Sequence, residues 1–338
     1  MELSTMFINL VDLSRPAPVE GTSGAPAPSR WPLLALVVLG VALVLTPFAI
    51  GLFSTAPKGA KMLADFRPFM TSARLEQFQV EMREVNAGVL ESNNRVASLL
   101  YGPGASGRQQ LAANVPTFAR FNNDWPAIDA SMTDLLDRVQ GNLGNYDAVA
   151  ALPSFELFPW FFVVPGLLIA GFAVVGLTTP RWWRRARRAV VVIGLGMVLA
   201  PVAFQMFDRA PAGGRMIDAF RTIETTQRVR TMQGYFGTMA VGQGSIRLEL
   251  VPALQHTGLT PDQIQARFAA VSALDRDWVH ILNDMTPMIG AMSDNVTSYR
   301  AMAALPPFTL FPWFFVGPGV LIAALALKAR TPRIEGTS

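Results

Sequence analysis

Four segments of this chain carry no ionisable side chain over at least 18 consecutive residues: 31–53, 157–177, 189–207 and 310–327. A helix rises about 1.5 Å per residue, so each segment is long enough, or nearly so, to cross a hydrocarbon core of roughly 30 Å. Apolar residues make up 51% of the chain and charged residues only 15%, a balance typical of membrane proteins. The sequence therefore predicts an all-α membrane protein with four transmembrane helices.

Arginines set the predicted orientation of these spans. The connection between the second and third spans reads RWWRRARR and contains five arginines and no acid: Arg181, Arg184, Arg185, Arg187 and Arg188. Under the positive-inside rule this connection and the basic tail lie in the cytoplasm, which places the N-terminus there too. The same arginines are predicted to contact anionic lipid headgroups. The net charge of +4 then comes from the segments predicted to lie in the cytoplasm, and nucleic acid is not an expected partner.

Of the 28 basic residues 25 are arginine, and with the Ala, Gly and Pro content this bias suggests a GC-rich bacterial genome. The predicted organisation therefore places the chain in a bacterial inner membrane with two domains on the periplasmic side. The segments, in order, are a disordered cytoplasmic arm rich in Pro, Ala, Gly and Ser (1–30), a first span (31–53), a first outer helical domain (54–156), a second span (157–177), a basic cytoplasmic loop (178–188), a third span (189–207), a second outer helical domain (208–309), a fourth span (310–327) and a cytoplasmic tail (328–338).

An internal repeat underlies this organisation. LPSFELFPWFFVVPG at 152–166 returns as LPPFTLFPWFFVGPG at 305–319 with three changes in fifteen positions. TPFAIGLFSTAPKGAKMLADFR, from residue 46, likewise matches APVAFQMFDRAPAGGRMIDAFR, from residue 200. A unit of span, outer domain and span therefore occurs twice. Both copies begin and end in the cytoplasm, so the prediction is two tandem parallel repeats related by an axis along the membrane normal.

The outer domains are expected to be helical and to form one bundle from both copies. Apolar residues of the second domain recur at three- and four-residue spacing, which indicates amphipathic helices. Thr260, followed by Pro261 and by Gln263, predicts a helix start with a capping box. Asp124 is predicted to cap a helix that begins beside Trp125. Loops are expected at 101–108 (YGPGASGR) and around 241–245 (VGQGS).

The two Phe-Pro-Trp-Phe-Phe boxes stand where the chain re-enters the membrane. One interpretation makes the tryptophans interfacial anchors and the first proline of each box a helix start. The other makes the aromatic residues a surface for a lipid or a partner helix. The candidate contact residues are Phe158, Trp160, Phe161, Phe162, Pro165, Phe311, Trp313, Phe314, Phe315 and Pro318.

Every predicted span contains a proline well inside it, and the four prolines are expected to lie at a similar depth in the membrane. Pro47 and Pro201 are candidate kinks near the outer ends of the first and third spans. Together with Pro165 and Pro318, they suggest a lateral groove that admits lipid. The alternative is simple close packing of the spans, with Gly166 and Gly319 at the contacts.

Catalysis finds little support in the sequence. The chain has no cysteine and two histidines, His256 and His280, for which no metal-ligand spacing partner is identified. No Ser-His-Asp constellation, phosphate loop or zinc-protease motif is evident. We therefore predict a protein that is not an enzyme, with no catalytic, cofactor-binding or metal-binding residue.

The Arg-rich, cysteine-free composition and the LFPWFFVxPG boxes resemble actinobacterial, mycobacterial-type integral membrane proteins. The chain is similar in general character to accessory membrane subunits of envelope lipid-transport systems of the Mce type. The resemblance implies a non-catalytic accessory or scaffold subunit whose partners are membrane lipids and other membrane subunits, and it transfers no functional residue. Two alternatives stay open: a stand-alone outer-leaflet lipid-binding protein, and a sensor that acts through a separate cytoplasmic partner.

Overall fold

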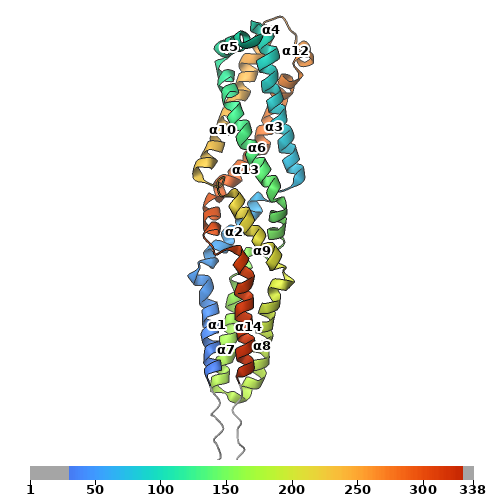
Figure 1. Cartoon of the computed structure of the whole chain (residues 1–338). Coiled ribbons are helices and arrows are strands. Elements are labelled where there is room, and N and C mark those ends of the chain that lie inside the picture. Colours follow the sequence, from blue (N-terminus) through green and yellow to red (C-terminus); the bar gives the residue numbers. More distant parts are fainter. Residues whose placement is uncertain (1–29, 330–338) are drawn as a thin grey trace, which may run out of the picture.

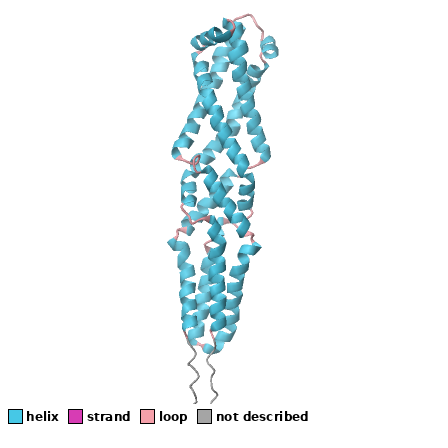
Figure 2. Ribbon diagram, in the orientation of Figure 1, coloured by secondary structure: helices cyan, strands magenta, loops and turns pink. Residues whose placement is uncertain are grey.

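The computed structural model describes residues 30–329, so the predicted arm at 1–30 and the tail at 328–338 lie almost entirely outside the described residues. The described residues form helices joined by short turns and contain no strand, which confirms the predicted all-α class (Figure 2). The molecule is elongated, with a lower bundle of long helices, a middle layer and an upper bundle (Figure 1).

The helices follow one another with few intervening residues. They are α1 (Trp31–Ala49), α2 (Leu52–Phe66), α3 (Ser72–Glu91), α4 (Ala97–Tyr101), α5 (Gly104–Asn114), α6 (Pro116–Ala150), α7 (Trp160–Thr178), α8 (Pro180–Ala203), α9 (Met206–Phe220), α10 (Thr226–Ser245), α11 (Val251–Gln255), α12 (Pro261–Arg267), α13 (Ala269–Ala303) and α14 (Phe311–Lys328). Single π-helical turns at Ser92–Val96 and Ile246–Leu250 continue α3 and α10, and 3₁₀ turns at Phe155–Leu157 and Phe308–Leu310 precede α7 and α14.

The lower bundle consists of α1, α7, α8 and α14, and these four helices are long and apolar enough to cross a membrane. Each contains a long stretch without charged residues, and the prediction of four helices with the length and composition of membrane spans is confirmed. In the bundle α1 packs against α7, and α8 packs against α14. Further contacts, between α7 and α8 and between α1 and α14, join these two pairs.

Glycines bring the paired spans into close contact. A methyl group added to Gly40 would lie 2.7 Å from the carbonyl oxygen of Gly166, and one added to Gly194 would lie 2.8 Å from that of Gly319. Small residues at such contacts let two backbones approach and gain dispersion energy that lipid cannot supply. Gly166 and Gly319 therefore act in close span packing.

Two predicted span boundaries are wrong, for identifiable reasons. The first span was expected to continue to residue 53, but α1 ends at Ala49, where the chain turns at Gly51, which adopts a left-handed conformation with φ of 66°. The third span was expected to end at 207, but α8 ends at Ala203, near Pro201, and Gln205 has φ of 53°. Pro47 and Pro201 thus stand in the last turn of α1 and α8, at the outer ends of the spans, and their role as kinks stays a prediction.

The basic segment 178–188, predicted as a loop, is also different in the structure. α8 begins at Pro180, a favoured residue at the first position of a helix, so the five arginines belong to its first turns. Thr179 alone separates α7 from α8.

The upper bundle is built by α3, α6, α10 and α13, with the short helices α4, α5, α11 and α12 at its tip (Figure 1). Its core is one continuous apolar cluster that includes Phe78, Phe118, Phe121, Trp125 and Trp278. α6 and α13 are each 35 residues long and run from the tip down to the lower bundle.

Helix starts in the upper bundle were predicted with mixed success. The capping box at Thr260 and Gln263 is confirmed, with both of its hydrogen bonds formed at the start of α12. Asp124 is not a cap, because α6 already begins at Pro116 and runs through it. The predicted loop at 241–245 is helix, and that at 101–108 is confined to Gly102 and Pro103, because α4 includes Tyr101 and α5 begins at Gly104.

The middle layer exchanges partners between the two halves of the chain. α2 leaves the end of α1 and packs against α13, while α9 leaves the end of α8 and packs against α6. The Asn295 side chain donates a 2.8 Å hydrogen bond to Asp65, and the Arg138 guanidinium donates one of 3.1 Å to the Ala219 carbonyl oxygen. Each half of the molecule is therefore completed by a helix from the other.

Several elements of the first half recur in the second half in the same order. α2, α3, the first π-helical turn and α4 have the same lengths, and the same gaps between them, as α9, α10, the second π-helical turn and α11. α6 and α13 are also equal in length. The π-helical turns are informative, because such turns are uncommon and local, yet both occur at corresponding places.

Candidate functional site

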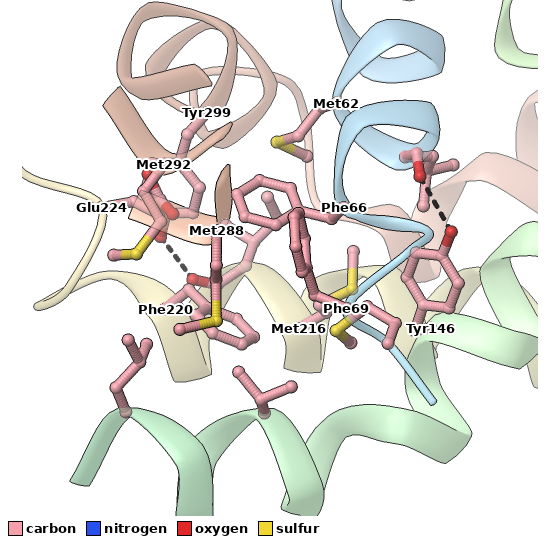
Figure 3. A pocket seen from close by; sticks show the side chains of 15 residues that line it. Met62, Phe66, Phe69, Tyr146, Met216, Phe220, Glu224, Met288, Met292 and Tyr299 are labelled. Carbon is pink, nitrogen blue, oxygen red and sulfur yellow. Dashed lines mark hydrogen bonds between the residues drawn. The ribbon is translucent and has the colours of Figure 1, made fainter. Parts of the chain in front are cut away.

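A cavity lies in the middle layer, where α2, α9, α6 and α13 meet above the spans (Figure 3). The lining residues are Met62, Leu63, Phe66, Phe69, Met70, Leu135, Val139, Tyr146, Met216, Ile217, Phe220, Glu224, Met288, Met292 and Tyr299. They come from both halves of the chain. The exchange of α2 and α9 between the halves is what brings them together.

The cavity is small and almost wholly apolar. The centre of a water-sized molecule can move within about 50 Å³ of it. A single water needs roughly 10–15 Å³ by that measure, but apolar cavities tend to stay dry and to take up apolar molecules instead. Five lining residues are methionines, whose unbranched and flexible side chains adapt to ligands of different shape. The site can therefore hold a small apolar group as it stands, and a larger one if the methionines move.

Two tyrosines donate hydrogen bonds to backbone carbonyl oxygens at the ends of the helices beside the cavity. At the end of α2 the Arg67 amide bonds to Ala64, so the Leu63 carbonyl oxygen lacks its usual helical partner and accepts a 2.8 Å hydrogen bond from the Tyr146 hydroxyl. At the end of α9 the Ile217 carbonyl oxygen accepts one from Tyr299 in the same way. Burial raises the pKa of Tyr299 to about 12, so its hydroxyl remains a donor.

Glu224 is the one acidic residue of the cavity wall. It is 5% exposed, and its Oε2 is buried without a hydrogen-bond partner. Figure 3 shows it beside Met288, Met292 and Tyr299 and away from Tyr146. Burial raises the pKa of its carboxyl group to about 8, so the group is largely protonated at neutral pH. It offers a hydrogen-bond donor to a bound molecule, or a negative charge once the proton is lost.

Sequence reasoning missed both the cavity and Glu224, although one signal pointed to the latter. When the similar segments that start at residues 46 and 200 are aligned, position 224 corresponds to Met70, and an acid that replaces methionine in a matching apolar pattern is unusual. The cavity itself depends on α2 and α9 crossing to the other half. No local pattern in the sequence encodes that crossing.

The aromatic boxes lie on the lower-bundle side of the cavity, and their phenylalanines contact one another. Phe158, Phe162, Phe311 and Phe315 are buried. The rings of Phe162 and Phe315 are 4.7 Å apart, and those of Phe158 and Phe311 are 6.3 Å apart. Phe161 also contacts Phe315, at 6.2 Å. These rings join the start of α7 to the start of α14, so they fill the centre of the bundle instead of facing a groove.

The remaining box residues face outwards or are half-buried. Trp160 and Trp313 are 52% and 57% exposed, and each packs edge-on against a phenylalanine, Phe53 or Phe207. Phe314 is 38% exposed. Pro165 and Pro318 are half-buried within α7 and α14. None of the ten predicted contact residues lines the cavity.

The predicted basic residues gather at the opposite end of the lower bundle. Arg181, Arg184, Arg185 and Arg188 are exposed and Arg187 is half-buried, all on the first turns of α8. Trp183 between them is buried and donates a 3.0 Å hydrogen bond to the Ala329 carbonyl oxygen. The guanidinium of Arg185 lies over the Trp182 ring, 5.4 Å from its centre. The start of α8 thus exposes its arginines, while the buried Trp183 attaches the helix to the end of α14.

One group of described side chains has the arrangement of metal ligands. Glu81 on α3 lies beside His280 and Asp284, which are one helical turn apart on α13. The expectation that His280 lacks a ligand-spacing partner is therefore wrong, because a residue one turn away was overlooked and Glu81 is distant in the sequence. Comparisons of the chain with protein-family models, curated proteins and solved structures gave no significant match.

Proposed function

We propose that this protein is a non-catalytic component of a bacterial cell envelope that binds the apolar part of a lipid or similar amphiphile in the cavity of the middle layer. The observation that supports this is an apolar, methionine-rich cavity directly beyond the spans, within reach of molecules that leave the bilayer. Small-molecule sites are typically concave and apolar with a few polar groups, which here are Glu224 and the tyrosine hydroxyls.

The proposal includes a topology. The N- and C-termini lie in the cytoplasm, and the upper bundle lies on the periplasmic side of the inner membrane. The five arginines at the start of α8 support this orientation. Because the chain has no cysteine, single cysteines introduced at exposed Ser106 and Arg181 are unique targets. A membrane-impermeant maleimide applied to spheroplasts should label Ser106→Cys and spare Arg181→Cys, and the reverse result would overturn the orientation.

We also propose that the two halves are copies of one parallel unit. Matching lengths of α2 with α9 and of α6 with α13 support this, together with the repeated aromatic boxes. A duplicated unit accounts for a cavity whose walls are similar on both sides. Met62 faces the cavity together with its counterpart in the second copy, Met216, and Tyr146 faces it together with its counterpart, Tyr299.

A substitution that fills the cavity tests lipid binding. Val139 lines the cavity and is buried, so Val139→Phe should occupy the free space, whereas Val80→Phe adds the same bulk at a position that is 47% exposed. Native mass spectrometry of the protein in detergent should find bound lipid on the parent and on Val80→Phe, and several-fold less on Val139→Phe. Equal lipid retention in all three proteins would overturn the proposed site.

We further propose that the protein acts as an accessory subunit of a lipid-transport assembly. The interlocked phenylalanines and the close glycine contacts make the lower bundle a firm framework that other membrane subunits could contact. Purification from the native host in mild detergent should then recover larger polypeptides with it. Recovery of the protein alone, at the size of a monomer or homo-oligomer, would contradict the accessory role and leave the lipid site to be judged separately.

A further inference from the structure

A group of polar side chains bridges α3 and α13 in the upper bundle. Glu81 comes from α3, and His280 and Asp284 come from successive turns of α13. One donor atom of each residue lies within 4.8 Å of the other two. His280 Nε2 and Asp284 Oδ2 are 3.3 Å apart. None of these residues belongs to the wall of the apolar cavity.

Glu81 is the residue whose surroundings are incomplete. It is only 6% exposed, and its Oε1 accepts a 2.9 Å hydrogen bond from Gln77. Its Oε2 is buried without a hydrogen-bond partner. Buried carboxylate oxygens nearly always have a donor or a cation beside them, because an unpartnered one loses its hydration without compensation. A cation held between Glu81 and its neighbours would supply the missing partner.

We propose that Glu81, His280 and Asp284 bind one divalent transition-metal ion, for which Zn²⁺ is the best-suited candidate. One imidazole nitrogen and two carboxylate oxygens form a common ligand set for Zn²⁺, and three protein ligands leave a position for water. His280 and Asp284, one helical turn apart, lie on the same face of their helix. The His280 side chain is 72% exposed, so an ion can reach the group from solvent.

Two neighbouring side chains set the expected affinity. Gln77 Nε2 donates hydrogen bonds to both carboxylates, and Arg74 Nη1 lies 3.4 Å from Asp284 Oδ2. An incoming ion must displace the Gln77 amide, and it is repelled by the Arg74 guanidinium. The site is therefore expected to bind more weakly than a purely acidic one, and removal of the Arg74 charge should tighten binding.

The corresponding contact between α10 and α6 carries no such group. When the two copies of the repeat are aligned, the positions equivalent to Glu81, His280 and Asp284 hold Tyr235, Ala127 and Ser131. One ion per chain is therefore expected. His280 can also be replaced by alanine, the residue found at the equivalent position 127. Because its side chain is exposed, we expect the replacement to leave folding intact.

Isothermal titration of the full chain with Zn²⁺ tests the site, in detergent and without a polyhistidine tag. One equivalent should bind, His280→Ala and Glu81→Gln should each weaken the affinity at least tenfold, and Arg74→Gln should strengthen it. His256→Ala, which removes the other histidine, should bind as the parent does. Absence of stoichiometric binding by the parent, or equal affinity of the parent and His280→Ala, would overturn the proposal.

Discussion

At the residue scale, Glu224 is the clearest difference between the two halves of the cavity wall, because the residue that aligns with it in the first half is Met70. Its counterpart Met70 shows that a flexible apolar side chain fits the same surroundings. Burial raises the pKa of Glu224 to about 8 from the usual 4.5, so between these values the folded protein keeps a proton that the unfolded chain has lost. Stability should therefore fall as the pH rises from 4.5 to 8, by roughly 3 kcal/mol at pH 7.

Glu224→Met should remove this penalty. We expect its thermal midpoint to exceed that of the parent by several degrees at pH 7.5 and to approach it at about pH 3.5, where the carboxyl group is largely protonated in both states. Glu76→Gln, at an exposed position on α3, is the matched control and should change neither value. A stabilisation of Glu224→Met that does not depend on pH would mean that packing, not charge, limits the parent.

The hydroxyls of Tyr146 and Tyr299 allow a second test at this scale. Each satisfies a backbone carbonyl oxygen at the end of α2 or α9 that has lost its helical partner. Tyr146→Phe and Tyr299→Phe should each cost about 1–3 kcal/mol, because a buried acceptor is left unpaired. Denaturant unfolding measures the loss. Tyr235→Phe, at a tyrosine outside the cavity wall, should cost less.

At the element scale, glycines decide how closely the helices approach. Gly40 has no room for a methyl group, whereas one added to Gly171 on α7 would meet nothing within 4 Å. Gly40→Ala should force α1 away from α7 and lower the free energy of unfolding by about 1–3 kcal/mol. Gly171→Ala should be neutral or slightly stabilising. Thermal unfolding in one detergent compares the two, and equal midpoints would exclude a tight contact at Gly40.

The elements also show where sequence reasoning succeeds and where it fails. The four spans were predictable because a helix in lipid must hide charge over its whole length, and the capping box because its residues are adjacent. The predicted loop at 241–245 failed because its glycines suggested a turn. Gly242 instead lies against Phe121 of α6, which leaves no space for a side chain. Such a tertiary cause is invisible in a local pattern, and so is the cavity.

At the scale of the whole molecule, the crossing of α2 and α9 ties the halves together. We expect the upper bundle and the middle layer to unfold in one transition, since neither half has a complete core alone. Asn295→Ala, which removes the hydrogen bond to Asp65, should speed hydrogen exchange in α6 and α9 as much as in α2 and α13. Thr297→Ala, at an exposed position on the same helix, should leave exchange unchanged. Faster exchange confined to α2 and α13 would indicate independent units.

The same crossing imposes an order on biosynthesis. α2 ends at Phe66 and its partner α13 begins only at Ala269, so most of the chain is made between them. At roughly 5–20 residues per second that interval lasts about 10–40 s. Throughout it, the methionines and phenylalanines of α2 and of the turn after it, which later line the cavity, lack the helix α13 that covers them in the folded protein. A newly made chain is therefore most exposed to proteases and to aggregation after its first two spans are inserted, and a chaperone that guards α2 during this interval would raise the yield of folded protein.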